Sequence, residues 1–476
     1  MATAPSFDFD GNVDRALADG QLRTNLRRAM DILVEKRRAV FDDTENLQAL
    51  RSAGNAIKRR ALSKLPQLLE KLEKNCEKNG IRVHWAEETQ EANRIVLDIV
   101  RSHDVAEVVK GKSMVSEEMH LNRYLADHDV EALETDLGEF IIQLNGETPS
   151  HIIVPAIHKN KDEVADIFHE KIPDTPYTED VEALTAIARK VLRKRFAAAK
   201  VGVSGVNFAV AETGTLLLVE NEGNGRMCTT APDVHVAVMG LEKVVEKLSD
   251  VPPLLRLLTG SATGQLITTY VNMITSPRKE AEKDGPKEVH LVILDNGRSR
   301  ILADPELRQT LLCIRCGTCL NHCPVYLRIG GHAYGHVYPG PIGKILTPQM
   351  EGLDRAGVLA LASSLCGACA EVCPVKIPIP SLIRRLRAES YAGGDKKAVP
   401  GGGCSRNLTE TMIWKGWELV NLMPTANRLS LKAAGLLGGR APKIGPLRKW
   451  TCTRTSPVFA RESLHERTKK EGVKDE

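Results

Sequence analysis

The sequence predicts an α/β domain over residues 77–300, followed by an α-helical domain over residues 301–392. The first prediction rests on strand-like and helix-like segments that alternate from residue 81 onward. Such alternation is typical of a parallel sheet covered by its crossover helices. The second prediction rests on two cysteine-rich runs between Cys313 and Cys373, which hold seven of the eleven cysteines.

Length, composition and charge limit the classes of protein to which the chain can belong. A chain of 476 residues, 42% of them apolar, is long enough for two or three domains with substantial cores. The formal net charge of +4 is too small for a protein that binds nucleic acid through charge. No apolar run approaches the roughly 20 residues of a transmembrane helix, and the first residues do not resemble a signal peptide. We therefore expect a cytoplasmic protein with reduced thiols, and leave open its association with a membrane through partner proteins.

The segments on either side of the two domains also carry predictions. Residues 1–76 are predicted to be helical, because apolar residues recur there at helical spacing, with a second helix over 47–76. Residues 393–476 are predicted to be a linker and a basic C-terminal module. A helix is expected over 408–422, and residues 401–461 carry a surplus of eight positive charges. Such a module is typical of docking to a partner or an anionic surface, or of a solvated tail.

The α/β prediction is built from segments in chain order. Strands are predicted from β-branched and apolar runs at 81–85, 107–111, 131–136, 151–155, 201–206, 209–211, 215–219, 234–239 and 289–294. Helices are predicted from apolar residues at helical spacing at 91–102, 117–125, 162–169, 180–200 and 241–247. In the second domain, Asp304 is expected to cap a helix that leads to Cys313, and another helix is expected over 380–391. The segment 330–343 between the cysteine runs is too rich in Gly and Pro to predict regular structure, and we expect it to wrap the metal site.

Several turns of the α/β domain are rich in Gly, Ser, Thr and acidic residues. They lie at 202–207, 212–215, 221–225 and 259–264. Backbone amides in such turns can hold an anion, and tight turns alone explain them equally well. The segment Lys110-Gly-Lys112-Ser113 favours an anion site more, because two lysines and a hydroxyl follow a predicted strand.

The first cysteine run has the spacing C-x2-C-x2-C-x3-C-P, formed by Cys313, Cys316, Cys319 and Cys323. The second run repeats it with Cys366, Cys369 and Cys373, and Ser363 stands where the first cysteine is expected. This spacing is typical of bacterial ferredoxins, in which closely spaced thiolates surround an iron–sulfur cube. Zinc ribbons seldom carry three cysteines at two-residue gaps before a C-P pair. Disulfides do not suit an odd number of cysteines in a long chain.

We therefore predict two [4Fe–4S] clusters with crossed ligation, because the last cysteine of each run ligates the other cluster in two-cluster ferredoxins. Cluster one takes Cys313, Cys316, Cys319 and Cys373. Cluster two takes Cys323, Cys366 and Cys369, with Ser363 as a candidate fourth ligand. With three thiolates, cluster two is either [3Fe–4S] or a [4Fe–4S] cluster with a labile iron, held by Ser363, by water or by a partner's group. The isolated cysteines are expected to be ordinary thiols: Cys76, Cys228, Cys404 and Cys452.

Four stretches carry a family resemblance: Glu134-Thr-Asp-Leu-Gly-Glu139, Ala211-Glu-Thr-Gly-Thr215, Tyr338-Pro-Gly-Pro-Ile-Gly343 and Ser363-Ser-Leu-Cys-Gly-Ala-Cys369. With the cysteine runs, they resemble the lactate utilisation protein B family over nearly the whole chain. The resemblance implies a first domain similar to the ribose-phosphate isomerase and CoA-transferase folds, and a ferredoxin-type second domain. It also implies two partners, a cysteine-rich subunit similar to glycolate oxidase subunits and a second α/β-domain subunit. No catalytic residue is implied.

The implied function is that of an iron–sulfur electron-transfer subunit in the oxidation of L-lactate to pyruvate. Such an oxidation releases two electrons, and two one-electron clusters can divide them. The sequence holds no flavin or nicotinamide fingerprint, so we expect the hydride step elsewhere and leave open whether this chain is itself an enzyme. Two alternatives remain. The substrate is another 2-hydroxy acid such as glycolate, or the α/β domain binds a phosphorylated or CoA-like ligand while the clusters sense redox state.

Overall fold

The computed structural model describes residues 8–391, 399–400, 408–436, 460 and 462–472. These residues belong to two compact units, which divide between Cys404 and Ser405. Most of the predicted linker, the isolated Cys404 and Cys452, and much of the basic stretch 401–461 lie outside the described residues.

The first unit contains a six-stranded sheet whose neighbouring strands all pair in parallel. Its strand order is β1-β10-β7-β4-β2-β3. The strands are β1 (Arg82–Ala86), β2 (Glu107–Lys110), β3 (Glu131–Glu134), β4 (Val201–Gly205), β7 (Val234–Gly240) and β10 (Glu288–Leu294). Strands β4 and β7 are buried along their whole length, as expected of a parallel sheet covered on both faces. The predicted parallel sheet is confirmed.

A second sheet of four strands has the order β8-β5-β6-β9. Its strands are β5 (Phe208–Val210), β6 (Thr215–Glu220), β8 (Val244–Val245) and β9 (Tyr270–Ile274). The helix predicted over 241–247 is wrong, because only a 3-10 turn, Leu241–Lys243, precedes β8. The two valines of β8 pair in parallel with β5, and β-branched residues suit such pairing better than a helix.

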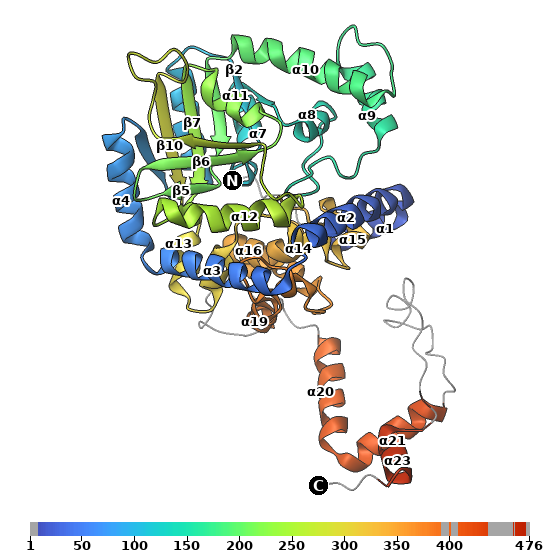
Figure 1. Ribbon diagram of the computed structural model, residues 1–476. Helices are drawn as coiled ribbons and strands as arrows, with labels where there is room; N and C mark the ends of the chain where they lie inside the picture. The colour runs from blue at the N-terminus through green and yellow to red at the C-terminus, as the bar shows by residue number, and fades with distance from the viewer. Residues whose placement is uncertain (1–7, 392–398, 401–407, 437–459, 461, 473–476) are drawn as a thin grey trace. The chain divides into compact units, whose positions relative to one another are not determined.

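Helices cover the parallel sheet and connect its strands (Figure 1). They are α5 (Thr89–Arg101), α6 (Met114–Glu118), α7 (Leu121–Ala126), α8 (Leu137–Leu144), α9 (Lys161–Lys171), α10 (Val181–Ala198) and α11 (Asn224–Thr230). Helix α12 (Val251–Ala262) instead lies between β8 and β9 of the second sheet in the chain. The single helix predicted over 117–125 is interrupted at His120, whose φ is 51°. The strand predicted over 151–155 is absent. There, His151 Nδ1 accepts the backbone N–H groups of Ile153 and Val154, which folds the segment into a turn.

Four helices begin the chain: α1 (Phe9–Ala18), α2 (Gly20–Val40), α3 (Thr44–Ser63) and α4 (Leu65–Lys78). The helical prediction for this region is confirmed, but the helix predicted over 47–76 is divided at Lys64. Pro66 explains the division, because proline has no N–H for the preceding turn and is tolerated only at a helix start. Figure 1 shows α2 and α3 against the cysteine-rich region.

The cysteine-rich region is mainly helical. It contains α13 (Arg298–Ala303), the 3-10 helices η3 (Leu307–Leu312) and η4 (His332–Tyr334), α14 (Thr318–Asn321), α15 (Tyr326–Ile329), α16 (Gly340–Glu351), α17 (Leu353–Leu361), α18 (Ala368–Glu371) and α19 (Ile379–Tyr391). Asp304 Oδ1 accepts the N–H groups of Glu306 and Leu307, as a capping side chain would. The predicted helix start is nevertheless wrong, because the segment leading to Cys313 is the 3-10 helix η3, which begins at Leu307 and has Glu306 at its N-cap. The segment 330–343 contains regular structure that we did not predict, since η4 lies within it and α16 begins there.

One continuous hydrophobic core joins the N-terminal helices, the second sheet and the cysteine-rich region. Leu26 of α2, Leu216 of β6 and Leu382 of α19 are each 0% exposed and belong to it. The cysteine-rich helices are therefore packed onto the α/β part rather than joined to it by a linker.

The second unit has three described helices, α20 (Leu408–Leu422), α21 (Pro424–Leu436) and α23 (Leu464–Lys470). The helix predicted over 408–422 is confirmed. No helix in the described part of the chain is long and apolar enough to cross a membrane.

Candidate iron–sulfur centre

Cys313, Cys316, Cys319 and Cys373 line one cavity together, although about 50 residues of chain separate Cys319 from Cys373. Two left-handed residues curl the first run around this cavity, Arg315 with φ 61° and Gly317 with φ 71°. Glycine adopts this conformation at little cost, whereas a non-glycine residue does so only when its surroundings hold it. The four thiols that we assigned to cluster one from the sequence therefore converge in space.

Cys323, Cys366 and Cys369 line a second cavity, and Ser363 lines it with them. The backbone repeats the conformation of the first run, because Leu365 has φ 55° and Gly367 has φ 88°. These two residues flank Cys366 as the left-handed residues of the first run flank its second cysteine. The second run is thus a structural copy of the first.

Ser363 occupies the place that Cys313 has in the first run. The Cys313 Sγ accepts the backbone N–H of Arg315 at 3.4 Å. In the same way, the Ser363 Oγ accepts the backbone N–H of Leu365 at 3.2 Å. The hydroxyl therefore faces the second cavity from the position of a fourth ligand.

Further N–H groups point at the sulfur atoms. Tyr326 donates its backbone N–H to Cys323 Sγ at 3.5 Å, and Ile377 donates to Cys373 Sγ at 3.3 Å. The buried Lys344 ammonium donates to Cys323 Sγ at 3.5 Å and is 1% exposed. Hydrogen bonds and positive charge at sulfur suit thiolates, and they are among the features that tune iron–sulfur clusters.

Without a metal, these thiols are poor acids. Burial raises the pKa of Cys373 to about 11, with a further contribution from Cys313. Burial also raises the pKa of Cys369 to about 11, followed by the effect of Cys323. Clustered thiols in an apolar setting are costly to ionise, and a bound metal centre offsets this cost because it coordinates thiolates. The donor set and its hydrogen bonds therefore fit iron–sulfur clusters.

The two cavities differ in their access to solvent. In the first, Cys316, Cys319 and Cys373 are buried and Cys313 is half-buried. In the second, Cys366 is exposed. The second cavity therefore lies at the surface, and the first lies deeper in the protein.

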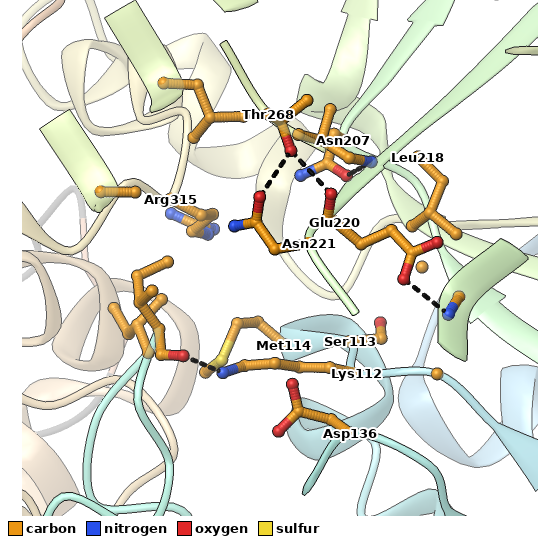
Figure 2. Close-up of a pocket in the computed structure, with 18 of the residues that line it drawn as sticks. Lys112, Ser113, Met114, Asp136, Asn207, Leu218, Glu220, Asn221, Thr268 and Arg315 are labelled. Carbon is orange, nitrogen blue, oxygen red and sulfur yellow. Dashed lines mark hydrogen bonds between the residues drawn. The ribbon is translucent and has the colours of Figure 1, made fainter. Parts of the chain in front are cut away.

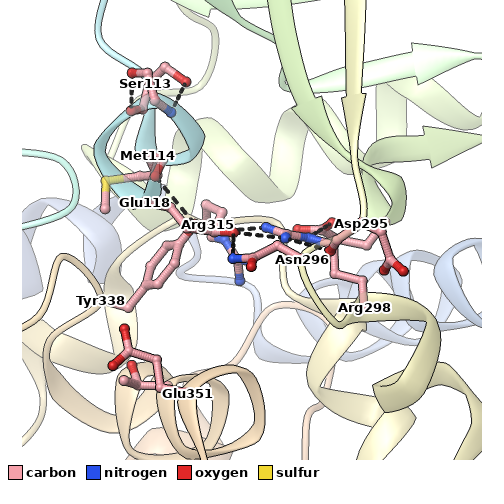
Figure 3. A network of polar contacts seen from close by, with 12 residues as sticks. Ser113, Met114, Glu118, Asp295, Asn296, Arg298, Arg315, Tyr338 and Glu351 are labelled. Carbon is pink, nitrogen blue, oxygen red and sulfur yellow. Dashed lines mark hydrogen bonds and ion pairs between the residues drawn. The ribbon is translucent and has the colours of Figure 1, made fainter. Parts of the chain in front are cut away.

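A buried polar network ties the first cavity to the α/β part (Figure 3). Arg298 donates two hydrogen bonds to the carboxylate of Glu118, each 2.8 Å, and one to Glu242 at 2.6 Å. Arg315 donates to the other Glu242 oxygen at 3.1 Å and lies 4.7 Å from the centre of the Tyr338 ring. The Tyr338 hydroxyl donates to Glu118 at 2.7 Å. Neither the periodicity nor the motifs of the sequence indicate these partners.

Buried cations gather near Cys313. Lys58 and Lys243 are both buried, and desolvation lowers the pKa of each to about 8 although the neighbouring Glu242 raises it. Two nitrogens of Arg315, Nε and Nη1, are buried without a partner in the described residues. A cluster with four thiolates is an anionic group, so positive charge here supports its presence beside Cys313.

A larger pocket of about 410 Å³ lies beside the first cavity, and Ile152 and Arg315 line both. Figure 2 shows Arg315, Lys112 and Asn221 among its lining residues. Three of the four polar turns singled out in the sequence contribute to its wall, at 202–207, 221–225 and 259–264, and the turn at 212–215 does not. The pocket lies at the carboxyl ends of β2 and β4, where α/β proteins bind their ligands.

The expectation that Lys110 helps to bind an anion is wrong. Its ammonium is 0% exposed and is engaged by two carboxylates, Glu134 at 2.5 Å and Glu117 at 3.1 Å. Of that segment, Lys112 and Ser113 do line the pocket. No pattern in the sequence marked Lys243 as a pocket residue, because it is one of several charged residues that follow an apolar strand.

Comparison with known proteins identifies the same three parts. The sequence matches the LUD domain over residues 69–294, the 4Fe-4S dicluster domain over 309–377, and the C-terminal domain of lactate utilisation protein B over 385–473. The resemblance stated from the sequence motifs is thereby confirmed, and so is the iron–sulfur character of the cysteine-rich region.

Full-length relatives agree. The chain is 41% identical to lactate utilization protein B of Shouchella clausii, over 98% of each chain. It is 39% identical to lactate utilization protein B of Bacillus subtilis, over 97% of this chain and 98% of that one. It is also 39% identical to the uncharacterized electron transport protein YkgF of Escherichia coli, over 97% and 96% of the two chains. The chain belongs to the lactate utilisation protein B family.

Proposed function

We propose that this chain is the iron–sulfur electron-transfer subunit of a multi-protein system that oxidises L-lactate to pyruvate. The observation that carries the proposal is the pair of neighbouring thiol-lined cavities, one at the surface and one buried beside a pocket. Burial and the other thiols of the first cavity raise the pKa of Cys319, and so does Cys369 of the second cavity. Because such an effect acts only over a short distance, the two cavities are close together. The names of the relatives support lactate as the substrate of the system.

The proposed ligands are those that the cavities bring together. Cys313, Cys316, Cys319 and Cys373 hold a [4Fe–4S] cluster, and the second cavity holds a cluster through Cys323, Cys366 and Cys369. When bound, the clusters supply one-electron redox chemistry, and two of them can divide the electron pair that a 2-hydroxy acid releases. The protein's own residues place the thiols, donate hydrogen bonds to sulfur and exclude water from the first site.

The proposal includes two companion subunits, one cysteine-rich and one with a second α/β domain. Exposed apolar side chains on α20 support docking to a partner, since Trp414 and Trp417 are 59% and 60% exposed. The centres of their rings are 6.0 Å apart, and aromatic residues that are exposed side by side are enriched at protein interfaces. We also propose that the parallel sheet and its attached second sheet share the ribose-phosphate isomerase and CoA-transferase fold.

The test is anaerobic purification of the cluster-loaded chain, alone and with both companions, followed by electron paramagnetic resonance. With the companions present, L-lactate should reduce the clusters, and glycolate at the same concentration should do so much more slowly. The chain alone should not oxidise L-lactate with an artificial acceptor. Rapid turnover by the isolated chain would contradict the electron-transfer role, and equal reduction by glycolate would contradict lactate as the substrate.

A further inference from the structure

The pocket beside the first cavity has no role in the electron path just described. Its walls include the apolar residues Ile153, Val206, Leu218 and Leu258. Polar side chains lie on two opposite sides, one with Asn221 and the other with Lys112 and Asp136 (Figure 2). A volume of about 410 Å³ falls within the range of roughly 300–1,000 Å³ that is typical of sites for drug-sized ligands. A three-carbon acid would occupy only a small part of it.

Lys243 provides the main evidence that the occupant is an anion. Lys243 lines the pocket and is 7% exposed, and its ammonium forms no hydrogen bond or ion pair with any described residue. A buried charge without a partner is costly, and proteins normally pair such groups. Glu242 and Cys313 attract this ammonium only through space. A negatively charged ligand in the pocket would supply the direct partner that it lacks.

A second unpartnered group lies in the same wall. Thr259 lines the pocket, and its buried hydroxyl has no hydrogen-bond partner in the described part of the chain. An ammonium and a hydroxyl without protein partners at one pocket are groups that a bound ligand can satisfy.

The acidic residues of the pocket are held by backbone N–H groups, whose dipoles offset part of their negative charge. Glu220 accepts from Gly225 and Arg226 at the start of α11. Asp136 caps α8 by accepting from Glu139 at 3.1 Å. Glu222 accepts from Leu137 at 3.1 Å, and burial followed by the charge of Asp136 raises its pKa to about 7, so it is partly neutral at physiological pH.

We propose that this pocket binds an organic anion the size of a mononucleotide, with its acid group at Lys243 and its body along the wall that Ile152 and Arg315 share with the first cavity. Because the pocket lies beside a proposed cluster, the organic anion best suited to it is one that carries a redox-active heterocycle. That part of the inference rests on the proposed electron-transfer function, whereas the binding site itself does not.

The experiment measures binding to the full-length, cluster-loaded protein by anaerobic equilibrium dialysis. The probes are flavin mononucleotide, adenosine monophosphate and L-lactate. We expect flavin mononucleotide to bind, and to bind at least tenfold more weakly to Lys243→Met and to Thr259→Val. Both variants should melt close to wild type, because neither loses a hydrogen bond or an ion pair within the protein. Lys190→Met, an exposed lysine on α10, is the matched control and should bind as wild type does.

Each other result counts against the proposal. Binding of L-lactate alone, in a manner that depends on Lys243, would overturn the inferred ligand size. Binding of adenosine monophosphate without flavin mononucleotide would overturn the redox-active class. Failure of all three probes, or equal binding to the Lys243→Met variant, would remove the site. None of these results affects the reduction of the clusters by lactate and the companion subunits, which is measured without added nucleotide.

Discussion

The carboxylate of Glu242 is predicted to hold the cysteine-rich region onto the α/β part. Its two oxygens accept hydrogen bonds from Arg298 at 2.6 Å and Arg315 at 3.1 Å, and its side chain is 0% exposed. The substitution Glu242→Gln keeps the shape but removes the charge, and its amide NH2 replaces the oxygen that faces one of the two guanidinium groups. Buried positive charge would then remain without sufficient compensation.

The magnitude follows from the acidity of this carboxyl group. Burial acts to raise its pKa, but Arg298 and then Arg315 outweigh it and lower the pKa from 4.5 to about 2. At about 1.4 kcal/mol per pKa unit, this shift corresponds to roughly 3 kcal/mol. That agrees with the loss of about 3–5 kcal/mol that is typical when one partner of a buried ion pair is removed. At the lower end of roughly 2–4 °C per kcal/mol, the melting temperature should fall by about 6 °C.

The assay is anaerobic calorimetry of the cluster-loaded protein at pH 7, with Glu70→Gln, an exposed residue on α4, as control. Because the folded-state pKa of Glu242 is depressed, its stabilisation is present above about pH 4.5 and is lost as the pH falls toward 2. The difference between wild type and Glu242→Gln should therefore narrow over that window. A variant that melts within 1 °C of wild type at pH 7 would refute the reasoning.

Three further predictions concern the clusters. Cys373→Ser and Cys313→Ser should abolish the same paramagnetic signal, because both thiols line one cavity; loss of different signals would disprove the crossed ligation. Ser363→Cys should make cluster two more resistant to air, since the hydroxyl already lies in a ligand position, and unchanged decay would exclude this role. Lys344→Met should lower the reduction potential of cluster two, because it removes a buried cation next to Cys323. Coulomb's law with an effective dielectric constant of about 20 gives a decrease on the order of 100 mV. Potentiometric titration would test this, and an unchanged potential would contradict it.

The sequence by itself determined the local features. The parallel strands were predictable because buried β-branched runs alternate with amphipathic helices, and such patterns depend on neighbours in the chain. The grouping of Cys373 with the first run was predictable because ferredoxin spacing encodes it. Errors arose where a contact distant in sequence or a side chain overrode propensity, as at His151, which folds a strand-like segment into a turn, and at Val244–Val245, which pair with β5.

Only the tertiary structure decided what surrounds the clusters. Glu118, Glu242 and Arg298 meet because the chain closes on itself over 180 residues, and no local pattern records such a meeting. The same closure brings three polar turns, the unpartnered Lys243 and the first cysteine run to one pocket. Spacing along a chain specifies a metal site whose ligands lie close together in sequence, whereas a pocket between distant segments exists only once the core that they share has formed.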